Sequence, residues 1–198
     1  MNKFHKNKII FIILFIFFIL VILCSLVYFY IIRNREKKLY SFSEKLDEKY
    51  QTISLYSTNN STNTSEYSSS HIIGKISIDK INLNYSILST CSEDLLKISP
   101  CRICGPEPNQ IGNLCIAGHN YDNGKFFSNI NKLNIGDIIR IYDLNNNYLE
   151  YSIYDKFEVK TNNTSVLNQN TNNIRELTLI TCNNKNKTRI ILKAKEMD

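Results

Sequence analysis

The stretch LEYSIYDKFEV, residues 149–159, alternates apolar and polar side chains along its length. Leu149, Tyr151, Ile153, Phe157 and Val159 would fall on one face of an extended strand, and the polar residues between them would fall on the other. Such alternation with a period of two is typical of an antiparallel strand with one buried face and one solvated face. The sequence therefore predicts a long, half-buried β-strand here.

Short segments with strand-like patterning recur on both sides of this stretch. They are Ile73–Ile78, Ile81–Leu88, Leu114–Ala117, Ile138–Tyr142, Leu177–Cys182 and Arg189–Ala194. Helical patterning is confined to two short pieces, Ser92–Ile98 and Phe126–Leu133. Several short strands separated by Asn-rich and Gly-containing turns favour a closed or nearly closed β-barrel, because closure removes exposed strand edges. We expect a mainly β domain.

The N-terminal region carries an apolar run, Ile9–Ile32, that contains no charged residue. As a helix it would be about 36 Å long, which exceeds the roughly 30 Å of a hydrocarbon core. A cleaved signal peptide would have a shorter apolar region that ends in small residues. This run instead ends with Tyr28 and Tyr30 among bulky residues, so an uncleaved transmembrane anchor is predicted.

The segment after the anchor, residues 33–70, is predicted to be a stalk followed by a flexible linker. Glu36–Ser54 is charged, and Ser57–Ser70 consists almost entirely of Ser, Thr and Asn. The folded domain is expected to begin near His71 and to span residues 71–198. Of the net charge of +6, residues 1–70 carry +4, so most of the excess flanks the apolar run and indicates no nucleic-acid-binding patch on the folded domain.

Three residues of the patterned domain could support cysteine-based catalysis. His5 precedes the apolar run and His71 lies at the domain boundary, so His119 is the only histidine embedded in the patterned domain, where it stands at the end of an apolar strand. Cys182 closes a second strand, and Arg189 opens a third. If these strands form a hairpin, Cys182 and Arg189 would face each other at its base. A guanidinium there would favour the thiolate and could stabilise an oxyanion.

These residues together resemble the sortase family. Thr178-Leu179-Ile180-Thr181-Cys182 matches the TLxTC signature of the family, Ala117-Gly118-His119 matches the segment that bears its catalytic histidine, and Arg189 falls at the position of its arginine. Weaker likeness extends from about Ile73 to Lys195. The apolar anchor is also a feature of the family.

The resemblance implies an eight-stranded sortase-like barrel with short helices, preceded by a single-pass anchor. Residues 1–8 would be cytoplasmic, and the catalytic domain would be extracellular. The implied enzyme is a cysteine transpeptidase of the thiol-protease type, which cleaves an LPxTG-like sorting signal through a thioacyl intermediate. Its implied catalytic residues are His119, Cys182 and Arg189, and its partners are surface proteins with a sorting signal and an amine of peptidoglycan or of a pilin-like protein.

The class within the family is less defined by the sequence. Thr161–Glu176 has no room for the long helix that one class inserts, which favours a class A or class D-like enzyme. No cofactor or metal is expected, and calcium activation is left open. Where the family commonly has a histidine-tyrosine-proline-like stretch, this chain has Ser99–Pro106, which contains two cysteines.

The additional cysteines allow an alternative function. Cys101, Cys104, Cys115 and His119 are of the types, and of the number, that a tetrahedral zinc site requires. The alternative is a membrane-tethered zinc-binding interaction or sensor module. A disulfide between Cys101 and Cys104, or from Cys91 to either, is also chemically allowed outside the membrane, and its connectivity is open.

Overall fold

The computed structural model of the protein describes residues 3–59 and 72–197, which form two units divided between Ser41 and Phe42. Helix α1 (Lys3–Asn59) begins in the first unit and ends in the second. In the first unit, the apolar side chains from Ile12 to Ile32 are exposed, and the helix is long and apolar enough to cross a membrane. This helix contains the apolar run Ile9–Ile32 that the sequence predicts as an anchor.

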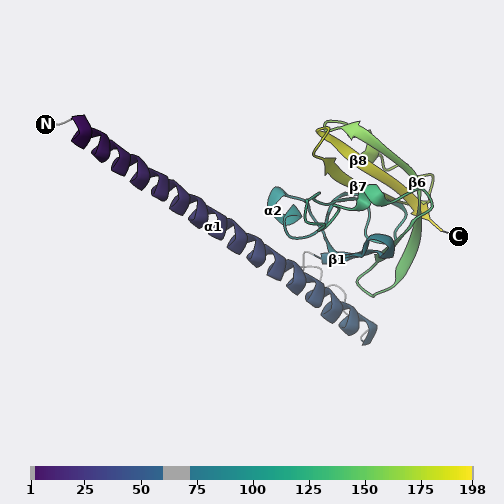
Figure 1. Ribbon diagram of the computed structural model, residues 1–198. Helices are drawn as coiled ribbons and strands as arrows, with labels where there is room; N and C mark the ends of the chain where they lie inside the picture. The colour runs from purple at the N-terminus through teal and green to yellow at the C-terminus, as the bar shows by residue number, and fades with distance from the viewer. Residues whose placement is uncertain (1–2, 60–71, 198) are drawn as a thin grey trace. The chain divides into compact units, whose positions relative to one another are not determined.

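The second unit contains a closed barrel of eight strands (Figure 1). The strands follow each other around the barrel in the order β1-β2-β3-β4-β7-β8-β6-β5, and β5 pairs with β1 to close it. The strand bounds are β1 Ile72–Ile78, β2 Leu83–Leu88, β3 Cys101–Cys104, β4 Gly112–Ala117, β5 Ile138–Tyr142, β6 Tyr148–Lys160, β7 Arg175–Asn183 and β8 Thr188–Glu196. The predicted mainly β, eight-stranded fold is confirmed.

Short helical elements occupy four of the connections within the barrel unit. They are α2 (Glu93–Leu96) and the 3-10 turns η2 (Asp79–Ile81), η3 (Ile130–Lys132) and η4 (Ser165–Leu167); η2 joins β1 to β2. The predicted helix over Ser92–Ile98 corresponds to α2, whose N-cap Ser92 accepts a hydrogen bond from the Leu95 amide. The predicted helix over Phe126–Leu133 contains only η3.

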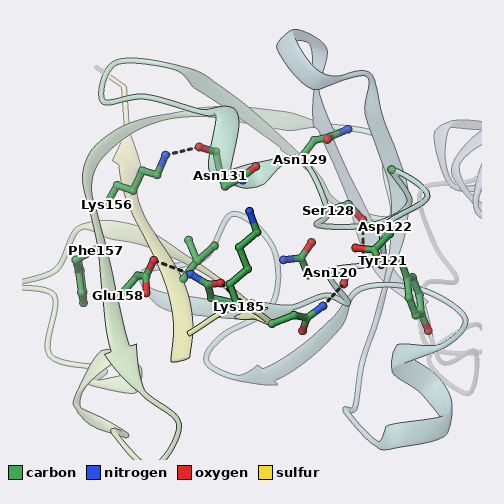
Figure 2. A pocket seen from close by; sticks show the side chains of 14 residues that line it. Asn120, Tyr121, Asp122, Ser128, Asn129, Asn131, Lys156, Phe157, Glu158 and Lys185 are labelled. Carbon is green, nitrogen blue, oxygen red and sulfur yellow. Dashed lines mark hydrogen bonds between the residues drawn. The ribbon is translucent and has the colours of Figure 1, made fainter. Parts of the chain in front are cut away.

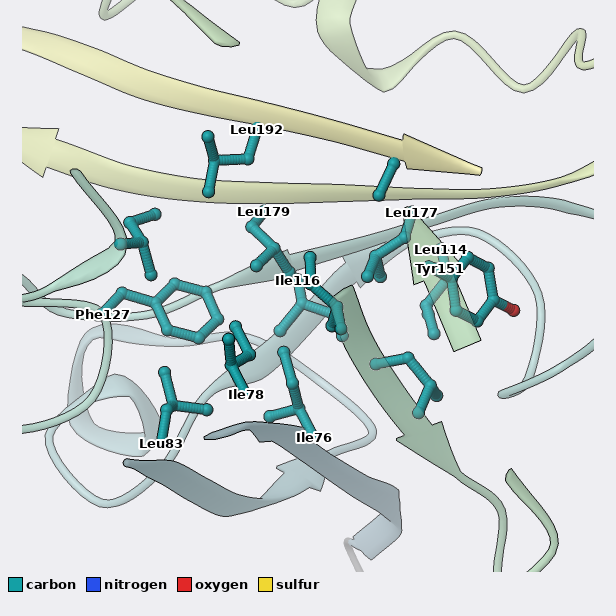
Figure 3. Packing of buried hydrophobic residues seen from close by; sticks show 14 of the residues in the cluster. Ile76, Ile78, Leu83, Leu114, Ile116, Phe127, Tyr151, Leu177, Leu179 and Leu192 are labelled. Carbon is teal, nitrogen blue, oxygen red and sulfur yellow. The ribbon is translucent and has the colours of Figure 1, made fainter. Parts of the chain in front are cut away.

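The barrel interior is filled by aliphatic side chains together with Phe127 and Tyr151 (Figure 3). Alternate residues of β4 and β7 contribute to this core, namely Leu114 and Ile116 from β4, and Leu177 and Leu179 from β7. Their neighbours in sequence therefore point to the outer face of the barrel, since successive side chains of a strand lie on opposite faces. This parity decides which side of the sheet carries the candidate site.

The predicted extent of β6 is confirmed, but the prediction that its apolar residues all share one face is wrong. Tyr151 and Ile153 lie in the barrel core, but Phe157 and Val159 pack in a separate cluster with Val166, Ile180 and Ile191. The pairing of β6 with β8 shifts register between Ile153 and Asp155. A β-bulge of this kind inserts one residue and reverses the facing of every residue beyond it.

The end of α1 packs on the barrel within the second unit. Tyr50 is fully buried, and its hydroxyl donates a hydrogen bond of 2.8 Å to the carbonyl of Asp143. Asp47 accepts hydrogen bonds from the amide and the hydroxyl of Ser86, at 2.7 and 2.6 Å. The compact unit thus begins at Phe42, whereas the sequence placed the boundary near His71 and assigned this helical segment to a stalk.

The predicted linker is only partly covered by the described residues. Ser57–Asn59 belongs to α1, and residues 60–70, together with the predicted boundary residue His71, lie outside the described residues. Sequence alone could not place Tyr50 in a core, because its hydrogen-bond acceptor lies 93 positions away in the chain.

The contact between Asp47 and Ser86 predicts a difference between two substitutions. Asp47→Ala leaves the two Ser86 donors without an acceptor and should cost about 1 to 3 kcal/mol of unfolding free energy. Asp47→Asn keeps an oxygen that can accept both hydrogen bonds, so its cost should be smaller. Denaturant unfolding of the full chain in detergent measures both. Equal losses would show that the carboxylate charge, not its acceptor geometry, matters.

The wild-type chain and Asp47→Asn should differ in the pH dependence of their stability. Burial raises the pKa of Asp47 above its usual 3.8, and this outweighs the lowering by the Ser86 hydrogen bonds and Lys75. The protonated form is therefore favoured in the folded state, and its stabilising contribution is lost as the pH rises through the raised pKa. The wild-type chain should gain stability relative to Asp47→Asn as the pH falls through that range.

Candidate active site

Strands β4 and β7 lie side by side in parallel and carry the candidate residues at their ends. Cys115 is paired with Thr178, and Ala117 with Ile180. The ladder continues past β4, because the Gly118 amide donates a hydrogen bond of 3.1 Å to the carbonyl of Ile180. Two residues beyond Ala117 and Ile180 along the same register stand His119 and Cys182. The parallel pairing therefore delivers both to one end of the same sheet face.

The two threonines of the TLxTC segment bind β7 to β4. The Thr181 hydroxyl donates to the carbonyl of Gly118 at 2.6 Å, directly before His119. The Thr178 hydroxyl donates to Oδ1 of Asn113 at 2.7 Å. Both hydroxyls are buried, where an unmade hydrogen bond would cost about 1 to 3 kcal/mol. These two contacts hold the strands that position Cys182 and His119.

Cys182 and Arg189 are register partners in the antiparallel pair β7 and β8, as predicted from the spacing. Both belong to the outer parity, since Ile180 and Ile191 of the same strands pack in the outer cluster. Cys182 is exposed and Arg189 is partly exposed. Directly opposite residues of an antiparallel pair are about 4.5 to 5.5 Å apart at Cα, so a thiol and a guanidinium share one accessible spot.

His119 is positioned by the turn that follows β4. Its carbonyl accepts a hydrogen bond of 3.0 Å from the Phe127 amide, and the Phe127 ring lies against Gly118. A Cβ at position 118 would come within 2.6 Å of that ring, so only glycine fits there. The His119 ring packs against Tyr121 with centroids 4.8 Å apart. Phe127 therefore fixes the backbone at His119, and Tyr121 packs against its ring.

The environment of His119 favours its neutral form. Burial lowers its pKa below the usual 6.5, Glu93 acts to raise it, and Lys97 acts to lower it. Its Nε2 is buried and has no hydrogen-bond partner among the residues that the structure describes. A neutral imidazole with an uncommitted ring nitrogen suits proton transfer near neutral pH.

Two substitutions in α2 test this electrostatic account. Glu93→Gln removes the group that raises the pKa of His119, so that pKa should fall further. Lys97→Gln removes a group that lowers it, so the pKa should rise. Titration of the His119 ring by NMR, assigned with His119→Gln, measures both shifts. Shifts in the same direction would indicate a rearrangement of α2 and not the loss of individual charges.

Sequence reasoning missed the side chains that organise the loop after Cys182. Nδ2 of Asn120 donates a hydrogen bond of 2.7 Å to the carbonyl of Cys182. Glu158 of β6 accepts hydrogen bonds from Asn183 and Thr188, at 2.8 and 2.7 Å, and these bonds lower its pKa. Only the barrel brings these positions together, because they come from three separate segments.

A polar pocket of about 690 Å³ lies beside the candidate residues (Figure 2). Its walls include Asn120 and Tyr121, which follow His119, and Asn183, which follows Cys182. Lys156 and Glu158 of β6 form another part of the wall. The three candidate side chains, His119, Cys182 and Arg189, are not among the described residues that line it, so the pocket adjoins the candidate site and does not contain it.

A buried apolar cluster lies on the same outer face of the sheet. It is formed by Ile180 and Ile191, whose strands also carry Cys182 and Arg189, and by Val166 of η4, which packs over them. Phe157 and Val159 at its rim are partly exposed and form an apolar surface. The covering segment is fixed by polar contacts, since Lys193 and Asn113 both donate to the carbonyl of Val166. Apolar groups thus approach the candidate thiol on one side, and the polar pocket borders it on the other.

The additional cysteines do not form the predicted zinc site. Within residues 3–59 and 72–197, no three His, Cys, Asp or Glu side chains come together in a way that could hold a metal ion. The thiols of Cys101 and Cys104 are directed to different partners: Cys101 contacts Cys91, and Cys104 lies opposite Cys115. Cys101 and Cys104 lie opposite residues that are two positions apart on β4, Ala117 and Cys115. The zinc-binding alternative is therefore not supported.

The Cys91 thiol lies close enough to the candidate site to respond to its charge. Its hydrogen bond with Cys101 lowers its pKa, burial and Glu93 act in the opposite direction, and Arg189 contributes to the lowering. The charge of Arg189 thus acts on Cys91, although the two residues are nearly half the chain apart in sequence.

Comparison with known proteins gives consistent matches. The family model "Sortase domain" matches residues 76–197. Sortase A of Bacillus anthracis is 35% identical over 115 residues, which cover 56% of this chain and 52% of that protein, so the chain matches about half the length of this curated relative.

Solved structures share the fold. A Clostridium perfringens sortase D5 transpeptidase is 32% identical, with a TM-score of 0.68 and coverage of 80% of this chain and 99% of that chain. Sortase A of Listeria monocytogenes, at 22% identity, has a TM-score of 0.59 and coverage of 65% and 88%. The second likeness concerns the fold alone.

Proposed function

Because this chain belongs to the sortase family, we propose that it is a cell-surface cysteine transpeptidase that cleaves an LPxTG-like sorting signal. The observation that carries the proposal is the pairing of Cys182 with Arg189 at the end of the sheet face where β4 leads into His119. Thiol, guanidinium and imidazole then act on one carbonyl. The reaction needs no cofactor, since the thiol itself is the nucleophile.

In the first half of the proposed reaction, the Cys182 sulfur attacks the Thr-Gly carbonyl of the sorting signal. The Arg189 guanidinium donates hydrogen bonds to the oxyanion of the tetrahedral intermediate. His119 takes the proton of the Cys182 thiol and gives it to the leaving amine, and the C–N bond breaks to leave a thioacyl enzyme. In the second half, His119 accepts a proton from an incoming amine, which attacks the thioester and releases Cys182.

The two surfaces beside Cys182 match the two substrates of this reaction. The apolar surface of Phe157 and Val159, at the rim of the buried cluster, suits the apolar residues of a sorting signal. The polar pocket that begins at Asn120 and Asn183 suits an amine acceptor, with Glu158 available to attract its positive charge. We propose that the acceptor is an amine of peptidoglycan or of a pilin-like protein.

We also propose a single-pass placement in the cell membrane, with the barrel outside. Support comes from α1, which is apolar and long enough to cross a membrane. This placement brings the enzyme to substrates that carry a C-terminal sorting signal.

The proposal is tested by trapping the thioacyl intermediate. The full chain in detergent micelles is incubated with LPxTG-type peptides, with and without an amine, and the adduct is followed by mass spectrometry. We expect an adduct on the peptide containing Cys182 that disappears when the amine is added. Cys182→Ala should abolish it, and Cys101→Ser should keep most of it. A folded sample that forms no adduct with any sorting-type peptide would overturn the proposal.

Arg189→Lys separates charge from geometry. Lysine keeps the positive charge but lacks the planar fork of donors, so the substitution should be costly. Loss of one oxyanion donor typically reduces the rate by about 10² to 10³, or roughly 3 to 4 kcal/mol. The loss should appear in the acylation rate and little in peptide affinity. A Lys variant with nearly full activity would mean that Arg189 acts only through the electrostatic field of its positive charge.

A further inference from the structure

A second pair of thiols lies on the same outer face of the barrel, away from the candidate nucleophile. Cys104 of β3 and Cys115 of β4 are register partners in an antiparallel pair. Cys115 shares its parity with Ala117 and His119, and it precedes His119 by four residues, or about 13 Å along a strand. The proposed transpeptidation has no use for these two thiols.

Three observations bring the two sulfur atoms together. Nε2 of Gln169 lies 3.7 Å from the Cys104 sulfur and 3.9 Å from the Cys115 sulfur. The pKa of Cys115 is raised to about 12, first by burial and then by the charge and hydrogen bond of Cys104. Directly opposite residues of an antiparallel pair have Cα separations of about 4.5 to 5.5 Å, which lie within the range that a disulfide spans.

We propose that Cys104 and Cys115 form a redox-active dithiol whose disulfide joins β3 to the strand that delivers His119. The oxidant is a low-molecular-weight disulfide such as oxidised glutathione, which the proposed extracellular placement would make available. The thiol chemistry itself does not depend on the transpeptidase activity, so the two proposals can fail separately.

The accessibility of the two thiols sets the order of the reaction. Cys104 is partly exposed, whereas Cys115 is fully buried. The Cys104 thiolate attacks one sulfur of the small disulfide, forms a mixed disulfide and releases one thiol. Cys115 then loses its proton and attacks the Cys104 sulfur, which releases the second thiol. Two electrons and two protons leave the protein pair, and the small disulfide is reduced to two thiols.

Mass spectrometry can follow this reaction without any activity measurement. The full chain with Cys182→Ala, which removes the candidate nucleophile, is equilibrated in detergent with mixtures of reduced and oxidised glutathione, quenched in acid, alkylated and digested with trypsin. The peptide of residues 103–125 contains Cys104 and Cys115 and no other cysteine. Under oxidising conditions this peptide should take up neither alkyl group. It should be about 2 Da lighter than the unalkylated peptide with two free thiols, because two hydrogen atoms are lost when the disulfide forms.

Two matched variants test the order of attack. Cys115→Ser keeps the accessible thiol and should accumulate glutathione on Cys104. Cys104→Ser keeps the buried thiol and should acquire none. A peptide that stays doubly alkylated would overturn the proposal. A link between residues 103–125 and the peptide of residues 98–102, which contains Cys101, would overturn it as well, because it would show the C-x2-C pairing instead.

Thermal unfolding provides a second readout. A disulfide that closes a loop of about twelve residues should raise the Tm of the oxidised chain by about 5 to 10 °C. Cys104→Ser should show no difference between the two glutathione conditions. A lower Tm in the oxidised chain would mean that the bond distorts β3 and β4, which contradicts a pair already in place for oxidation.

Discussion

Parallel hydrogen bonding between β4 and β7 is the constraint on which the candidate site depends, because it brings together residues 63 positions apart in the sequence. The pairing of Ala117 with Ile180 fixes the register of the two strands. It therefore also sets where His119 lies relative to Cys182. The buried hydroxyls of Thr178 and Thr181 reinforce this register at both ends. The signature threonines therefore have a structural role that precedes any chemistry.

Strand parity then distributes the functions of the barrel between its two faces. Leu177 and Leu179 fill the interior, while Ile180 and Cys182 belong to the outer surface. The bulge in β6 extends this outer surface, because it turns Phe157 and Val159 out of the barrel. One inserted residue thus widens the apolar surface beside the candidate nucleophile, and Glu158 in the same stretch fixes the loop after Cys182.

The same face carries two thiols with different surroundings. Cys182 is exposed at a hairpin base opposite a guanidinium, a setting that suits a nucleophile. Cys115 is buried beside Gln169, and its raised pKa keeps the thiol protonated. In our proposal it reacts only after Cys104 has formed a mixed disulfide, whose Cys104 sulfur it then attacks. Burial and charge, not the residue type, separate a candidate catalyst from a candidate structural thiol.

Sequence alone determined much of this protein. The alternation of apolar residues predicted seven of the eight strands and a closed barrel, and the spacing of Cys182 and Arg189 predicted their pairing, since a hairpin obeys local geometry. The apolar run predicted a helix long enough to span a membrane. These features depend on residues that are close together in the chain. The apolar periodicity and the turn residues therefore indicate them directly.

Tertiary structure alone decided the rest, because the remaining contacts join distant segments. The four-residue strand β3 is too short to show a period, and only its pairing with β4 shows that Cys101 lies opposite Ala117 and Cys104 opposite Cys115. The charges near His119 come from α2, and the acceptor for Tyr50 comes from the turn after β5. No local pattern records which segments a closed barrel makes adjacent, so these contacts appear only once the strands are ordered around it.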